Sequence, residues 1–161
     1  MSRILSSLPS KPVLNDVFES YPDLKEAFQT FRDKVLKTNG VLTELERETI
    51  ATHVSNLNSC KACTIRHSEN AKMLLGSQGT SDSNDPETSD RQARSSLEPI
   101  LSYAGKLTLQ PTSLTAEDAE AVYAAGWCEE ALLTSITIVS FMNMANRVVL
   151  GVGGEAAKVE L

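Results

Sequence analysis

Apolar residues return every three or four positions along most of this chain, the spacing that gathers them on one face of an α-helix. The clearest run lies between residues 23 and 37, where the apolar positions are Leu24, Ala27, Phe28, Phe31, Val35 and Leu36. No segment alternates apolar and polar residues for long enough to predict a β-strand. We therefore predict an all-α fold, with helices over residues 13–20, 23–37, 43–54, 60–75, 91–107, 115–126 and 129–150.

Polar residues at the ends of these segments support the predicted boundaries. Thr43 with Glu46, and Thr115 with Asp118, have the form of a capping box, in which two side chains satisfy the free N–H groups of a helix start. Gly40 follows the second predicted helix and is typical of a helix end, because glycine adopts the left-handed conformation needed there.

The segment 77–90 contains no large apolar side chain, so we predict a solvated polar loop at these residues. Neither half of the chain looks self-sufficient on its own, and we therefore expect one domain over residues 1–161. Pro99 suits a first helical turn better than a helix interior. The helix after the loop consequently has two alternative starts, near Arg91 and at Pro99.

The most apolar stretch, residues 131–153, is long enough to cross a membrane. It nevertheless carries seven polar residues: Thr134, Ser135, Thr137, Ser140, Asn143, Asn146 and Arg147. Arginine and asparagine are costly in the middle of a bilayer, and no basic flank or aromatic belt follows. We expect a protein without a membrane span, in which this helix is buried and part of it packs on a second copy in a homo-oligomer.

Charge and cysteine content narrow the possible functions. The 161 residues include 15 basic and 21 acidic ones, giving a net charge of −6, and this argues against nucleic-acid binding. The first residues are too short and too interrupted by serine and proline to form a signal peptide, so we expect a cytoplasmic protein. In that reducing compartment, three cysteines do not predict a disulfide framework.

The segment NSCKACTIRHSEN, residues 58–70, contains the most informative chemistry. At about 100° per residue, Cys63 lies about 60° around the predicted helix from Cys60, and His67 lies between them. Cys60 falls in the first turn, where free N–H groups and the helix dipole favour a thiolate. His67 is one turn beyond Cys63 and can take its proton. These features predict a dithiol redox site without a cofactor, but they do not decide which cysteine reacts first.

Two other interpretations of these residues remain open at this stage. Cys60, Cys63 and His67 could be three zinc ligands, but a structural zinc site normally needs four; His53 or Glu48 could be the fourth, yet the sequence has no second CxxC or HxxxH pair. Alternatively, the two cysteines could be small buried hydrophobic residues. We expect no metal. The sequence does not show whether Glu48 belongs to the site, because Glu44 and Glu46 lie on the same helix and all three could be solvated surface carboxylates.

The segment LTELERETIATHVSNLNSCKACTIRH resembles the signature of the alkyl hydroperoxidase D (AhpD)-like, carboxymuconolactone decarboxylase superfamily, and in particular its peroxidase-related branch. The matching positions are Arg47-Glu48, Val54-Ser55, Asn58, Cys60, Cys63 and His67. A second block is also similar to this family, and its matching positions are Leu114-Thr115, Gly126-Trp127 and Asn146-Arg147. The two blocks occur in the family's order and cover most of residues 10–155.

The resemblance implies an all-α homo-oligomer that reduces hydroperoxides with its two cysteines. It implies that Cys63 attacks the peroxide, that Cys60 resolves the sulfenic acid, and that His67 and Glu48 relay protons. The electron donor would be a dithiol, such as a lipoyl protein or a thioredoxin-like protein. Ala62 departs from the family pattern, which commonly has tyrosine or histidine there. Activity could therefore be weaker, or the substrate different.

Two other functions compete with this hypothesis. A carboxymuconolactone decarboxylase-like enzyme would share the fold, but it would not depend on a cysteine pair at these positions. A non-enzymatic, redox-responsive helical oligomer would use the disulfide to tune assembly. Cys128, at the expected start of the last helix, is interpreted as a small residue at a turn, because a thiol caps a helix poorly.

Overall fold

The computed structural model describes residues 4–19, 21–38, 40–77 and 86–154, with the backbone alone for residues 77 and 86–96. The elements are α1 (Leu14–Glu19), α2 (Pro22–Lys37), α3 (Glu44–Leu57), α4 (Lys61–Ser77), α5 (Pro86–Leu109), the 3-10 turn η1 (Pro111–Ser113), α6 (Ala116–Ala124) and α7 (Glu129–Gly151). The described ranges contain no β-strand. The predicted all-α class is thus confirmed.

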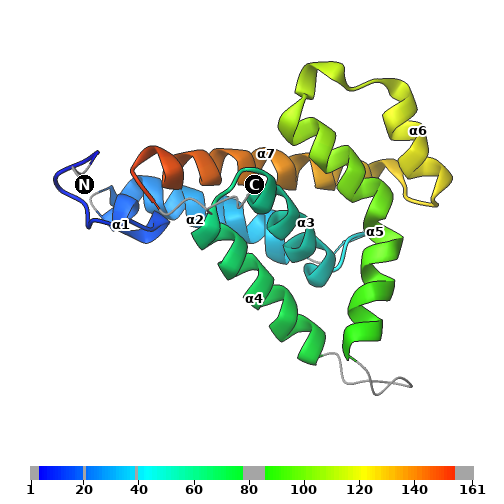
Figure 1. Cartoon of the computed structure of the whole chain (residues 1–161), viewed down its shortest axis with the longest axis horizontal. Coiled ribbons are helices and arrows are strands. Elements are labelled where there is room, and N and C mark those ends of the chain that lie inside the picture. Colours follow the sequence, from blue (N-terminus) through cyan, green and yellow to red (C-terminus); the bar gives the residue numbers. More distant parts are fainter. Residues whose placement is uncertain (1–3, 20, 39, 78–85, 155–161) are drawn as a thin grey trace, which may run out of the picture.

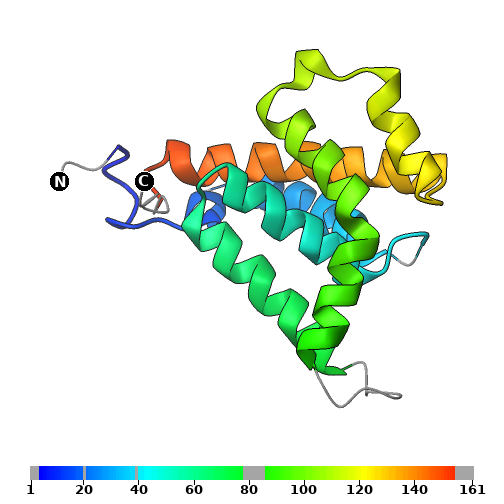
Figure 2. The same cartoon turned by 45° about the vertical axis from the view of Figure 1, so that its right-hand side comes forward.

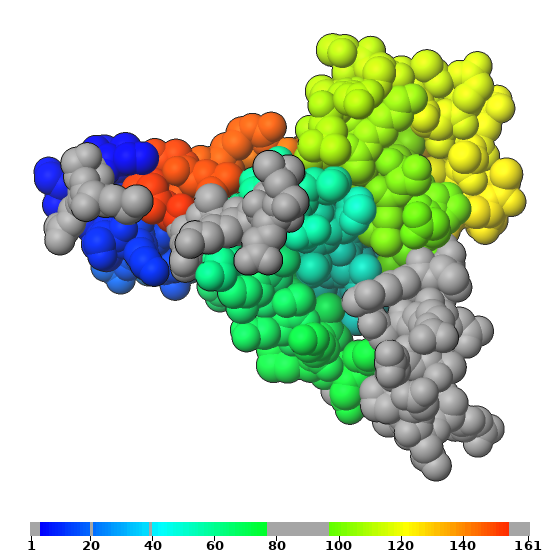
Figure 3. All heavy atoms as spheres, viewed as in Figure 1, coloured from blue at the N-terminus to red at the C-terminus, as the bar shows by residue number. Residues whose placement is uncertain are grey.

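The long helix α7 runs across the molecule above α2 and α3 in the view of Figure 1, while α4 descends below them and α5 crosses at one side (Figures 1 and 2). In Figure 3, the N-terminal segment and α1 lie at one end of the molecule, and α6 lies at the other. Helix α3 is central, because it packs against α4, α5 and α7. The largest fully buried apolar side chains come from most of these elements and are Leu36, Leu42, Ile50, Val54, Leu97, Ile100, Val122, Ile138, Val139 and Met142.

Both predicted capping boxes are present, whereas α2 ends at an extended Thr38 and Gly40 is not left-handed. The backbone N–H of Glu46 donates to Oγ1 of Thr43 at 3.2 Å, and Oε2 of Glu46 accepts from the backbone N–H of Thr43 at 2.7 Å. At the start of α6, a carboxylate oxygen of Asp118 accepts from the backbone N–H of Thr115 at 2.7 Å. These contacts fix where α3 and α6 begin.

Two boundaries differ from prediction around the polar segment. Helix α4 includes Ser77 and α5 already begins at Pro86, so the segment between the helices is shorter than the loop predicted over residues 77–90. Residues 78–85 lie outside the described part. Pro99 lies inside α5 and does not start a new helix. The buried face formed by Leu97, Ile100 and Ala104 continues through it, and packing outweighs one lost backbone hydrogen bond.

Helix α7 is long and apolar enough to cross a membrane by length and composition, but half of its apolar window is buried inside the protein. The residues that cover the core include Ile138, Phe141, Met142 and Ala145. It therefore packs as a core helix, as the sequence predicts. Whether its outer face contacts a second copy remains a prediction, as does one domain over residues 1–161.

Arg47 joins three parts of the fold on one side of α3. Its Nε donates to the carbonyl oxygen of Leu42 at 3.0 Å, and its Nη1 donates to that of Val35 at 2.8 Å. Burial lowers the pKa of this guanidinium below its usual value, while the nearby carboxylates of Glu46 and Glu130 oppose the shift. Arg47 thus anchors the end of α2 to the start of α3, and the next residue, Glu48, projects from a fixed backbone.

Candidate functional site

A tight elbow between α3 and α4 places the cysteine pair. Ser59 adopts a left-handed conformation, with φ of 57°. The N–H of Cys60 donates to the carbonyl of Ser55, and that of Ser59 donates to the carbonyl of Asn56, both at 2.9 Å. This is the hydrogen-bond pattern of a Schellman motif. The break thus falls at Ser59, so that α3 continues to Leu57 beyond the predicted end at residue 54, and Cys60 precedes the first turn of α4 instead of lying within it.

Cys60 and Cys63 form a disulfide, with their Cα atoms 5.4 Å apart. Both lie at the N-terminal end of α4, where the first N–H groups have no partner within the helix. Their environments differ, because Cys60 is fully buried and Cys63 is only half-buried. The two cysteines can therefore open and close a disulfide, and solvent reaches mainly Cys63.

His67 contacts Glu48 across the interface of α3 and α4. Nδ1 of His67 lies 2.6 Å from Oε2 of Glu48, and Nδ2 of Asn70 donates to Oε1 of the same carboxylate at 3.2 Å. Glu48 is only 2% exposed. Unlike the exposed Glu44 and the half-buried capping residue Glu46, this carboxylate is buried and fully engaged. The structure thus resolves the ambiguity that the sequence leaves among the three glutamates.

The second ring nitrogen of His67 is available for chemistry. A carboxylate oxygen accepts, so the tautomer of His67 that donates from Nδ1 to Glu48 leaves Nε2 as the basic ring nitrogen. Nε2 has no hydrogen-bond partner among the described residues. Every buried side-chain nitrogen or oxygen of the described residues has a hydrogen-bond partner, so an atom without a partner is not buried. Nε2 is therefore accessible from the adjoining space.

A cavity of about 420 Å³ lies beside Cys63 and His67 and opens to solvent. Cys63, His67 and Ala62 line it from α4. Its opposite wall is largely apolar and comprises Val13, Leu14, Phe18, Phe28, Phe141, Met142, Ala145 and Val149. The half-buried cysteine and the histidine thus face one space, while Cys60 does not line it.

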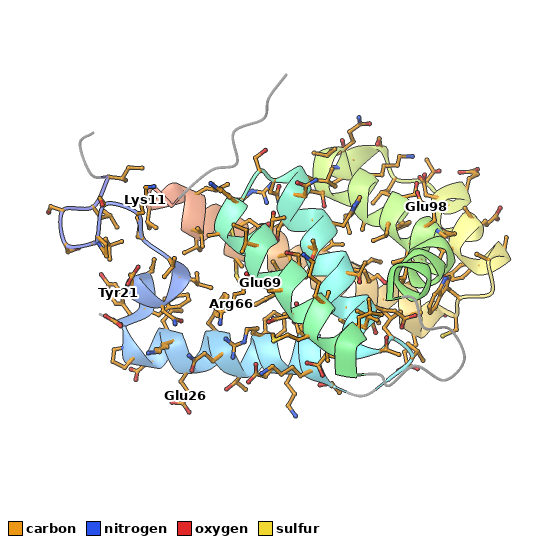
Figure 4. The ribbon with its side chains drawn as sticks, turned by 60° about the horizontal axis from the view of Figure 1, so that its bottom comes forward. Lys11, Tyr21, Glu26, Arg66, Glu69 and Glu98 are labelled. Atoms are coloured by element: carbon orange, nitrogen blue, oxygen red, sulfur yellow. A yellow bond between two sulfur atoms is a disulfide. The ribbon has the colours of Figure 1, made fainter. Side chains whose placement is uncertain are left out.

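A second cavity of about 460 Å³ reaches Glu48 and His67 from another direction. Its lining is more charged and includes Arg32, Lys37, Glu44, Arg66 and Asn70. Both cavities share Arg66, which extends from α4 toward α2 in Figure 4. His67 therefore lies between an apolar space that contains Cys63 and a polar space that does not.

The five candidate zinc ligands, Cys60, Cys63, His67, His53 and Glu48, do not gather at one point. His53 lies against α5, where a Cβ atom at Gly105 would be 3.5 Å from its Nε2, and Glu48 is engaged by His67. Within the described ranges, no three histidine, cysteine, aspartate or glutamate side chains are placed to hold a metal ion. This geometry does not support the zinc interpretation.

Cys128 is separate from the site. It is the exposed N-cap of α7, and its side chain makes no capping hydrogen bond. This agrees with its interpretation as a small turn residue.

An asparagine cluster, which sequence analysis did not assign, connects the elbow to α7. Nδ2 of Asn58 donates to Oδ1 of Asn143 at 3.1 Å and to Oδ1 of Asn146 at 3.0 Å, and Nδ2 of Asn146 donates to Oγ of Ser55 at 3.2 Å. Arg147 donates to Oδ1 of Asn143 at 2.6 Å. The sequence signal for this cluster was the presence of Asn143 and Asn146 on an otherwise apolar helix, because buried polar side chains need hydrogen-bond partners.

The model of the carboxymuconolactone decarboxylase family matches residues 22–79, which run from α2 to α4 and include the elbow, both cysteines, Glu48 and His67. No curated protein matches the sequence significantly.

Three solved structures share the fold. An uncharacterised peroxidase-related protein from Silicibacter sp. TM1040 is 20% identical with a TM-score of 0.69, over 97% of this chain and 92% of that one. An AhpD core, a peroxidase-related protein from Ralstonia eutropha JMP134, is 23% identical with a TM-score of 0.68, over 89% and 75% of the two chains. A protein of unknown function from Agrobacterium tumefaciens is 17% identical with a TM-score of 0.62, over 90% and 97%.

These likenesses establish the AhpD-like fold. Together with the family match, they support the resemblance to the AhpD-like, carboxymuconolactone decarboxylase superfamily that the two sequence blocks indicate.

Proposed function

We propose that this chain, with its AhpD-like fold, is a thiol-dependent hydroperoxide reductase. The observation that carries the proposal is the shared cavity of Cys63 and His67, with Glu48 bonded to the far side of the imidazole and Cys60 within disulfide reach. This arrangement contains a nucleophile, a base, a group that orients the base and a second thiol.

In the first step, Nε2 of His67 takes the proton of the Cys63 thiol, and Glu48 stabilises the imidazolium. The Cys63 thiolate attacks the terminal oxygen of a hydroperoxide, so that an S–O bond forms as the O–O bond breaks. The departing alkoxide takes the proton from His67 and leaves as an alcohol. Cys63 is thereby oxidised to sulfenic acid, and the hydroperoxide is reduced by two electrons.

In the second step, the thiolate of Cys60 attacks the sulfur of the sulfenic acid. A disulfide forms, hydroxide departs and is protonated to water, and the structure has this oxidised form. An external dithiol then reduces the disulfide by two exchange reactions, becoming a disulfide itself and restoring both thiols. A lipoyl or thioredoxin-like protein is the proposed donor, in a reducing cytoplasm.

Burial supports Cys63 rather than Cys60 as the attacking group. Cys63 lines the cavity and is half-buried, whereas Cys60 is fully buried and lines neither cavity. A peroxide entering from solvent meets Cys63 first. Sequence geometry left this choice open, because the helix start favoured Cys60 and the one-turn spacing to His67 favoured Cys63.

The test is peroxide consumption with dihydrolipoamide as the electron donor. We expect turnover by the wild type, none by Cys63→Ser, and one equivalent of peroxide consumed by Cys60→Ser, with sulfenic acid trapped on Cys63. Cys128→Ser is the matched control and should keep full activity, since this thiol is exposed and lies outside the site. Equal rates from wild type and Cys63→Ser would refute the proposal.

The family name attached to residues 22–79 makes decarboxylation of a cyclic lactone acid the second candidate. Carbon dioxide release from such an acid by both wild type and Cys63→Ser, without peroxide turnover, would support it. A redox-responsive oligomer would instead oxidise its thiols once per chain and change mass without turnover.

A further inference from the structure

We propose that the cavity beside Cys63 selects hydroperoxides that join a bulky apolar body to a carboxylate. Ala62 would set the width available to the body, and Arg66 would bind the carboxylate. This inference rests on the proposed reductase function and names the substrate class of the same site.

The walls of the cavity suit an apolar body. Phe18, Phe28 and Phe141 form a continuous aromatic cluster, with ring centroids 4.9 Å and 5.0 Å apart. Met142 and Val149 extend the same wall from α7. A volume of about 420 Å³ lies within the range of small-molecule sites and far exceeds the needs of hydrogen peroxide. Burying an apolar body there removes its surface from water.

Ala62 leaves room at the reacting end. It precedes Cys63 directly and lines the cavity with its methyl group only. A tyrosine here would project a ring from the same backbone position into the space beside Cys63. The small side chain therefore keeps this end wide enough for a branched or aromatic carbon next to the hydroperoxide group.

The charged residues in the lining of the cavity favour an anion. The charged side chains that line this cavity, apart from the titratable His67, are Arg32, Arg66 and Glu69. Arg32 is held by Asp33 at 2.8 Å, whereas Arg66 has no ion pair among the described residues. Arg66 is exposed and reaches toward α2 from the helix that bears Cys63 (Figure 4). It can therefore bind a carboxylate while the apolar body occupies the interior.

The experiment compares kcat/KM for hydrogen peroxide, cumene hydroperoxide and the para-carboxylate of cumene hydroperoxide, with dihydrolipoamide as donor. We expect wild type to favour the carboxylated compound. Arg66→Gln should lower its kcat/KM by about 10-fold and leave the uncharged cumene compound within about twofold. Lys72→Gln, an exposed cation on α4 that lines neither cavity, should change neither.

Ala62→Tyr tests whether Ala62 sets the width of the cavity beside Cys63. It should lower kcat/KM for both cumene compounds by at least about 10-fold and leave hydrogen peroxide nearly unchanged. If Ala62→Tyr does not fold, Ala62→Leu serves the same comparison with a smaller effect.

The possible outcomes separate the two proposals. Turnover of all three peroxides, with no preference and no selective effect of Arg66→Gln or the Ala62 variants, would overturn the inference and leave the reductase function intact. The cavity would then serve another occupant, such as the donor's dithiol arm or a second copy. Absence of turnover with every peroxide would overturn both.

Discussion

Asn58, in the elbow that precedes the cysteines, donates its side-chain amide to Asn146 on α7 at 3.0 Å, across 88 positions of the sequence. The same amide also contacts Asn143. The two sequence blocks that resemble the family therefore meet in space, and the backbone that carries Cys60 is attached to the core helix.

Asn58→Ala should destabilise the protein by about 1–3 kcal/mol, because Oδ1 of Asn146 loses its donor in a buried position. Urea unfolding measures this loss. Peroxide turnover should also fall, since the elbow loses its attachment to α7. Asn56→Ala is the matched control: this exposed side chain should contribute less than about 0.5 kcal/mol. Equal losses from both variants would count against the cluster.

Glu48→Gln should lower turnover about 100-fold, because a neutral amide cannot stabilise the imidazolium of His67. Glu48→Ala should in addition cost about 3 kcal/mol of unfolding free energy, since it leaves His67 and Asn70 without their shared acceptor. Steady-state kinetics and urea unfolding separate the two effects. The exposed Glu120→Gln should behave as wild type. Full activity in Glu48→Gln would exclude a proton relay through this residue.

The stability of the protein should fall on acidification through the titration of His53. Burial lowers the pKa of His53 below 6.5, while Glu98 and a hydrogen bond with the Leu101 backbone oppose the shift. Between the unfolded value near 6.5 and the lower folded value, the unfolded chain binds more protons. The unfolding free energy should therefore decrease as the pH falls below about 6.5. His53→Gln should show a shallower decrease, and an unchanged slope would exclude His53 as its source.

Ser59 should tolerate glycine but not a β-branched residue. Its φ of 57° is left-handed, which Val adopts only at a cost of about 1–2 kcal/mol. Ser59→Val should lower the urea midpoint accordingly, whereas Ser59→Gly should remain within about 1 kcal/mol of wild type. A Val variant as stable as the Gly variant would contradict the observed elbow geometry.

The protein should exceed its monomer mass of 17.5 kDa at micromolar concentration. Leu133 on α7 is 62% exposed and Phe31 on α2 is 47% exposed, so these helices leave apolar surface uncovered within one chain. Light scattering measures the mass, and Leu133→Glu should shift it toward the monomer. A monomeric wild type would rule out the predicted homo-oligomer.

Local chemistry made much of this fold predictable from sequence. Thr43 and Glu46 form the predicted capping box, and the helical spacing of Phe28 and Val35 corresponds to buried positions. Pro99 misled the prediction, because propensity alone does not include the packing that carries α5 through it. The helix lengths thus followed tertiary contacts as well as local sequence.

The site was only partly predictable. The cysteine pair and His67 lie close together in the sequence, so helix geometry could relate them. Selecting Glu48 among three glutamates required the resemblance, since burial and the contact with His67 depend on how α3 packs on α4. The asparagine cluster depends on an approach between distant segments, which no local pattern encodes.

Because Cys60 is buried and Cys63 is half-buried, the two cysteines of the disulfide are not equally accessible from solvent. In the proposed cycle, a thiol that arrives from solvent would therefore attack Cys63, so the mixed disulfide would form there and Cys60 would leave as the thiolate. If the proposed function holds, the peroxide and the electron donor would both reach Cys63 through this cavity, and a bound peroxide substrate would compete with the donor.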